Sequence, residues 1–179
     1  MSTDVTRALM LEIARGAVAG IVAGRTSSPP VLDDAPPASG VFVTLKKGGA
    51  LRGCIGTVEC RQPLAEEIAR VAVCAAREDP RFPPVTADEL PDLELEISVL
   101  GPLERIDPLD PDAIVIGRHG LVVEQGRRRG LLLPQVAPEW GWDREQFLAH
   151  TCRKAGLPLD AWRRGADVYR FEADVFDGG

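Results

Sequence analysis

A cysteine between two glycines is the residue of this chain best suited to chemistry. Cys54 lies between Gly53 and Gly56, so a ligand or a backbone segment could approach its thiol closely. Arg52 lies two residues earlier, and nearby positive charge favours the thiolate, which is the nucleophilic form of cysteine. The alternative is a half-buried cysteine that only packs, which is the commoner role of a single thiol.

Two further residues could assist such a thiol. Lys46 lies across a predicted hairpin from the cysteine segment and adds positive charge. His119, in a predicted turn over residues 117–120, is a candidate general base for Cys54. The alternative for His119 is a solvated turn residue.

A second cluster follows Pro134. Gln135, Glu139 and Trp142 could line a pocket, although tryptophans just before a helix more often clamp that helix onto a sheet. Residues 127–129 are three consecutive arginines, which could bind an anion but are more typical of a solvated hairpin tip.

Composition limits the class of protein. A net charge of −6 and a pI near 5.0 disfavour a nucleic-acid-binding protein. No continuous apolar segment is long enough to span a membrane, and no secretory signal is evident, so the four cysteines are expected to be free thiols in the cytoplasm. The histidines and cysteines have no metal-ligand spacing, so no metal site is predicted, and no cofactor is evident.

Hydrophobic periodicity predicts one α+β domain over residues 1–179. Its sheet is expected to be antiparallel or mixed, with flanking helices, because strict alternation of strands and helices is absent. Residues 25–39 contain four prolines and are predicted to be a surface loop. The predicted helices are 4–24, 63–77 and 144–155. The predicted strands are 40–46, 51–59, 93–99, 114–116, 121–124, 131–133 and 169–175.

The hexapeptide LRGCIG at residues 51–56 resembles the hallmark motif of the AMMECR domain family, also called AmmeMemoRadiSam system protein A. Further blocks resemble this family in order and spacing. They are Asp79-Pro80-Arg81-Phe82, the strand at 93–100, Leu132-Leu133-Pro134-Gln135-Val136, Trp142-Asp143 and the CRKAGL segment at 152–157.

The resemblance implies an α+β fold in two unequal lobes, with the hexapeptide lining a cleft between them. It also implies association with a Memo-like protein and a radical SAM protein. We therefore expect an enzyme or enzyme subunit whose candidate catalytic residues are Cys54, Arg52 and His119. The alternative is a non-catalytic binding partner of those two proteins, and a nucleic-acid-associated regulator is a weaker third possibility.

Overall fold

The chain divides into two compact units. The computed structural model describes residues 3–26 and 28–178. Unit 1 is Met1–Leu100 with Asp174–Gly179, and unit 2 is Gly101–Ala173. Each contains antiparallel strand pairs and helices, so the predicted α+β class is confirmed. Within the described ranges, no helix is long and apolar enough to cross a membrane. The cleft between two lobes stays a prediction.

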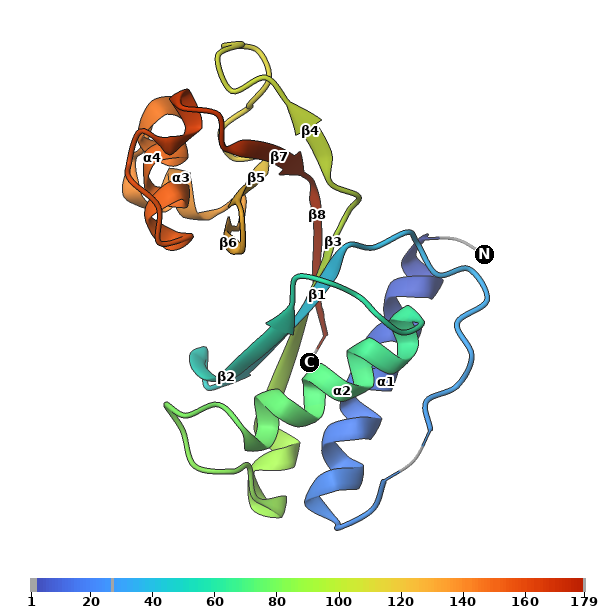
Figure 1. Cartoon of the computed structure of the whole chain (residues 1–179). Helices are drawn as coiled ribbons and strands as arrows, with labels where there is room; N and C mark the ends of the chain where they lie inside the picture. Colours follow the sequence, from blue (N-terminus) through green and yellow to red (C-terminus); the bar gives the residue numbers. More distant parts are fainter. Residues whose placement is uncertain (1–2, 27, 179) are drawn as a thin grey trace. The chain divides into compact units, whose positions relative to one another are not determined.

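Unit 1 is a sheet with helices on one face. Its strands lie in the order β2-β1-β3-β8, and β1 pairs antiparallel with both β2 and β3. Figure 1 shows its two helices side by side. The elements are α1 (Thr3–Val22), β1 (Gly40–Lys47), β2 (Ala50–Thr57), α2 (Leu64–Arg77), the 3-10 helix η1 (Ala87–Asp92), β3 (Leu93–Leu100) and β8 (Ala173–Gly178).

Successive side chains of a strand point to opposite faces of the sheet, so the buried residues of β1 show which face meets the helices. Val41, Val43 and Leu45 are fully buried, and they pack in one core with apolar residues of α1 and α2. The residues between them on β1 therefore point to the opposite face. Residues 25, 26 and 28–39 form neither helix nor strand, and Ser27 lies outside the described residues. Leu32 anchors this loop in the core.

Unit 2 has its own sheet, in the order β4-β7-β5-β6. Phe147 and Leu148 of its longest helix are fully buried against Leu121 and Val123 of the sheet. The elements are β4 (Glu104–Ile106), β5 (Gly120–Gln125), β6 (Arg128–Leu132), α3 (Val136–Trp140), α4 (Arg144–Lys154), the 3-10 helix η2 (Ala161–Arg163) and β7 (Asp167–Phe171). The Asp143 side chain accepts a hydrogen bond from the Gln146 backbone N–H, and the Gln146 side chain accepts one from the Asp143 N–H, which forms a capping box at the start of α4.

Three predicted elements of the second half are wrong. Residues 114–116 form no strand, because the Val115 backbone is bonded within a tight turn: its N–H donates to His119 and its carbonyl accepts from the Arg118 N–H. The strand predicted over 131–133 has the wrong bounds, because β6 runs from Arg128 to Leu132. The single strand predicted over 169–175 is broken at Glu172, and its halves, β7 and β8, belong to different sheets.

Candidate functional site

The hexapeptide at residues 51–56 lies wholly within β2, at the edge of the unit 1 sheet. β1 and β2 form the predicted hairpin, and Gly48 and Gly49 make its turn. Their φ values of 58° and 78° are left-handed conformations that favour glycine. The hairpin places Cys54 directly opposite Thr44.

The two glycines of the motif are required by close packing. Gly53 lies against the carbonyl of Ala75 in α2, and a β-carbon at Gly53 would overlap it. Gly56 lies beneath the aromatic ring of Phe42, its partner on β1, and leaves no room for a side chain. These glycines therefore fix the hexapeptide between α2 and β1.

Cys54 lies on the sheet face that points away from the helices, since Gly53 next to it faces α2. Its thiol is half-buried, and its sulfur accepts a hydrogen bond of 3.2 Å from the Thr44 hydroxyl. The Cys54 backbone N–H donates to the carboxylate of Asp79 at 3.0 Å. The cysteine is thus held at both its side chain and its backbone.

Asp79 caps the free edge of β2 beside Cys54. The residue is only 4% exposed, and its carboxylate accepts hydrogen bonds from the Cys54 N–H and from the backbone and guanidinium of Arg81. The Arg81 guanidinium, followed by the Cys54 N–H, holds the pKa of Asp79 well below its usual range. Asp79 is therefore a permanently charged anchor and a poor general base.

Arg52 is the extra residue of a β-bulge. Leu45 pairs with Gly53 and Lys46 with Leu51, so Arg52 has no partner on β1. Its guanidinium reaches Glu89 of η1 through two hydrogen bonds of 2.7 and 3.0 Å.

The pairing of Arg52 with Glu89 neutralises most of the charge predicted to act on Cys54. The Arg52 hydrogen bonds lower the pKa of Glu89 to about 2, and Glu89 raises the pKa of Arg52. Lys46 is likewise engaged, since its ammonium lies 3.1 Å from Glu96 on β3. The role of Arg52 that the contacts support is to tie β2 to η1.

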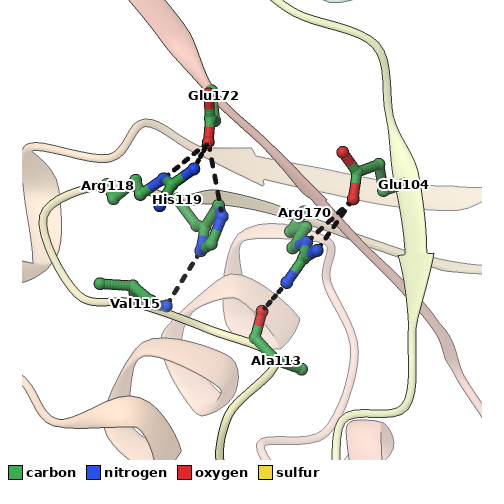
Figure 2. Close-up of polar contacts among 7 residues, drawn as sticks. All are labelled: Glu104, Ala113, Val115, Arg118, His119, Arg170 and Glu172. Carbon is green, nitrogen blue, oxygen red and sulfur yellow. Dashed lines mark hydrogen bonds and ion pairs between the residues drawn. The ribbon is translucent and has the colours of Figure 1, made fainter.

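His119 belongs to unit 2, so it and Cys54 lie in different units, and the predicted pairing of the two stays a prediction. Figure 2 shows its ring between the Val115 backbone and the Glu172 carboxylate. Nδ1 accepts a hydrogen bond of 2.9 Å from the Val115 N–H, and Nε2 lies 4.0 Å from Glu172. Burial, followed by the charges of Arg170 and Arg118, lowers its pKa.

The contacts of His119 do not favour the role of a general base. In the neutral ring the nitrogen without hydrogen is Nδ1, and its lone pair is occupied by the Val115 N–H. His119 therefore orders the loop before β5, and Arg118 reinforces this loop through an ion pair of 2.6 Å with Glu172.

Gln135, Glu139 and Trp142 come together around α3 in unit 2. Gln135 and Glu139 are exposed, and their backbones share a hydrogen bond. Trp142 stacks on His150 of α4, with ring centroids 3.9 Å apart, and Trp140 stacks less closely on Trp142 at 6.1 Å. Trp142 thus clamps α4, which is the structural alternative considered from the sequence, while Trp140 remains 71% exposed.

Sequence reasoning assigned no role to three residues that hold Cys54 and Arg52. Glu89 completes a capping-box pattern with Thr86, which indicates a helix start but not the contact with Arg52. Thr44 gives no sequence signal, because only strand register brings it to Cys54. Asp79 does give one, since it begins the Asp-Pro-Arg-Phe block. No group of three or more His, Cys, Asp or Glu side chains in the described part of the chain is arranged to hold a metal ion.

The AMMECR1 family model matches residues 11–176. The chain belongs to the AMMECR1 family. The hexapeptide, the Asp79 block and, apart from Met10, the buried core residues of both units lie within the matched segment.

Archaeal members of the AMMECR1 family are similar to this chain over most of its length. A protein of Thermococcus gammatolerans is 49% identical over 182 residues, which cover 94% of this chain and 88% of that protein. One of Methanothermobacter thermautotrophicus is 54% identical over 142 residues, covering 76% and 74%. The crystal structure of uncharacterized protein PH0010 from Pyrococcus horikoshii matches with a TM-score of 0.79 at 45% identity, covering 94% of this chain and 89% of that one.

Proposed function

We propose that the β2 site belongs to an enzyme or enzyme subunit in which the Cys54 thiol contacts the substrate, as a nucleophile or thiolate ligand. The proposal rests on the two hydrogen bonds that hold Cys54 in place. A hydroxyl fixes its sulfur, and the buried carboxylate of Asp79 fixes its backbone. A cysteine that only packs needs neither contact, whereas a reacting group must be held in one geometry by its surroundings.

The other three cysteines are in less reactive surroundings. Burial raises the pKa of Cys60, Cys74 and Cys152, which reduces their thiolate fraction at neutral pH. Cys60 is a matched internal control, because it lies in the same unit and is also half-buried. All four cysteines are free thiols, which supports the proposal of a reducing, cytoplasmic compartment.

Alkylation of the native protein tests the special status of Cys54. Iodoacetamide is added in short pulses between about pH 6 and 9, around the ordinary thiol pKa, and modified sites are mapped by mass spectrometry. Cys54 should be labelled first, with Cys60 well behind. Thr44→Val removes the hydroxyl and should change the rate at Cys54 alone. Equal labelling of Cys54 and Cys60 throughout would leave Cys54 as a packing residue.

Function in cells tests the catalytic role directly. Cys54→Ser and Cys54→Ala are introduced into a strain that lacks the protein, with Cys60→Ser as the matched control. Loss of function with both Cys54 variants, at normal protein level and with function retained in Cys60→Ser, supports the thiol role. Full function of Cys54→Ala would remove it.

We also propose that the protein works with Memo-like and radical SAM proteins, on the basis of its family resemblance. A non-catalytic partner role is the second candidate, and it is favoured by Trp140, whose large apolar side chain is 71% exposed. If Trp140→Ala lost binding to purified Memo-like and radical SAM proteins while Cys54→Ala kept both binding and function, the second candidate would replace the first.

A further inference from the structure

The charges of unit 2 are balanced in number, but three of its described cations have no partner within the unit. Residues 101–173 contain 11 basic and 11 acidic residues. Eight of the basic side chains contact a carboxylate or a backbone carbonyl, namely Arg105, Arg118, Arg128, Arg129, Arg144, Arg163, Arg164 and Arg170. Among the described residues, only Arg127, Arg153 and Lys154 of unit 2 have no such partner.

These three cations belong to one surface, although they come from segments far apart in the sequence. Gly130 of β6 lies so close to the backbone of Lys154 and Ala155 that a β-carbon there would overlap it. Arg128, next to the hairpin turn, donates a hydrogen bond to the Gly156 carbonyl just beyond α4. The end of the β5–β6 hairpin therefore lies against the C-terminal end of α4. We define the basic patch as Arg127, Arg128, Arg129, Arg153 and Lys154.

Helix capping accounts for only part of this charge. The C-terminal end of a helix carries the equivalent of about half a negative charge, which Arg153 and Lys154 in the last turn offset. Arg128 binds a carbonyl, and Arg129 lies 3.8 Å from Glu124, the one acidic partner among the contacts of the patch. The acids of unit 2 without a cationic partner lie elsewhere, at Asp107, Asp110, Asp112, Glu139 and Asp143.

We infer that the basic patch is a docking surface for a carboxylate-rich segment of a partner protein. Arginine side chains bind carboxylates through paired N–H groups, and exposed cations without internal partners lose little when they bind. A nucleic acid fits less well, because a chain with a pI near 5.0 lacks the extended basic face of a nucleic-acid-binding domain, whereas a short acidic segment needs only a local basic patch. This inference does not depend on the role proposed for Cys54.

Binding of a defined acidic probe tests the inference. A fluorescein-labelled peptide of ten glutamates is titrated with the full chain, and anisotropy is read at low and at physiological ionic strength. The test variant is Arg127→Gln/Arg153→Gln/Lys154→Gln. The control variant is Arg105→Gln/Arg163→Gln/Arg164→Gln, which removes the same charge from exposed positions elsewhere on unit 2.

The two variants separate local recognition from net charge, because each changes the charge of the chain from −6 to −9. We expect saturable binding that weakens with salt, a loss of about tenfold in the test variant and less than about twofold in the control. Equal losses in both variants, or no saturable binding at low ionic strength, would overturn the inference. Tighter binding of a single-stranded ten-nucleotide DNA than of the peptide would also overturn it, in favour of a nucleic-acid surface.

Discussion

Glu89→Gln removes the charge that neutralises Arg52 while keeping the size of the side chain. The Arg52–Glu89 pair has two short hydrogen bonds, and the two side chains are only 11% and 14% exposed. The remaining nitrogen of Arg52, Nη1, is buried without a hydrogen-bond partner, so the guanidinium depends on Glu89 for its stabilisation. The glutamine oxygen can still accept one of the two bonds.

The expected cost follows from these contacts. Removing one partner from a fully buried ion pair destabilises a protein by about 3–5 kcal/mol. Partial exposure and the retained hydrogen bond reduce this, so we expect a loss of about 2 kcal/mol in the free energy of unfolding. Glu94→Gln on neighbouring β3 is the control, because Glu94 is exposed. It should change stability by no more than about 0.5 kcal/mol.

The effect should also depend on pH. The pKa of Glu89 is about 2 in the folded protein and 4.5 in a reference side chain. The carboxylate therefore contributes its full stabilisation above pH 4.5, and this is lost as the pH falls towards 2. The difference in unfolding free energy between the native protein and Glu89→Gln should shrink over the same range.

Urea unfolding followed by far-UV circular dichroism measures this difference. The three tryptophans lie at positions 140, 142 and 162, so their fluorescence reports unit 2 separately. A loss for Glu89→Gln no larger than that for Glu94→Gln, or a difference that stays constant from pH 6 to pH 3, would show that the pair does not stabilise unit 1 as described.

Three further predictions concern packing and burial. Gly53→Ala should destabilise the protein by about 2 kcal/mol in urea unfolding, because the new methyl group meets the α2 backbone. Gly16→Ala, on the open face of α1, should instead stabilise it by about 0.5–1 kcal/mol. The pKa of His119 is lower in the folded protein than the reference value of 6.5, so the free energy of unfolding should decrease as the pH drops below 6.5. This decrease should be smaller in His119→Gln. Identical pH profiles of the free energy of unfolding in the two proteins would contradict this. Trp140→Ala should lower the free energy of unfolding by less than about 1 kcal/mol, and Phe147→Ala should lower it by about 3–5 kcal/mol. The reason is that Trp140 is 71% exposed and Phe147 is fully buried. Similar losses in the two variants would contradict the assignment of burial.

Local patterns predicted most of unit 1. The first helix, the glycine hairpin, α2 and β3 have strong periodicity and clear turn residues, and each formed close to its predicted bounds. The errors fall where long-range contacts decide. Ile114 and Ile116 suggest a strand, but a side chain takes the Val115 N–H that a strand would need. Apolar and polar residues alternate without interruption over 169–175, although the chain passes from one sheet to the other at Glu172.

The candidate site was predictable only in part. Its centre, Cys54 between two glycines, could be recognised from the sequence alone. The β-bulge that turns Arg52 towards Glu89 could not, because a one-residue shift between two strands changes no residue pattern. For the same reason, nearby basic residues predicted an electropositive thiol, whereas Glu89 and Glu96 compensate Arg52 and Lys46.

The break at Glu172 makes unit 2 an insertion within unit 1. The Gly101 N–H donates to the Glu172 carbonyl at 2.7 Å, so the inserted segment leaves and returns at adjacent points. During synthesis, the sheet that carries Cys54 cannot receive its fourth strand until the whole of unit 2 has left the ribosome. Unit 2 can therefore fold on the nascent chain before the sheet of unit 1 is complete. That sheet is completed late, when β8 pairs with β3, a strand far from it in the sequence.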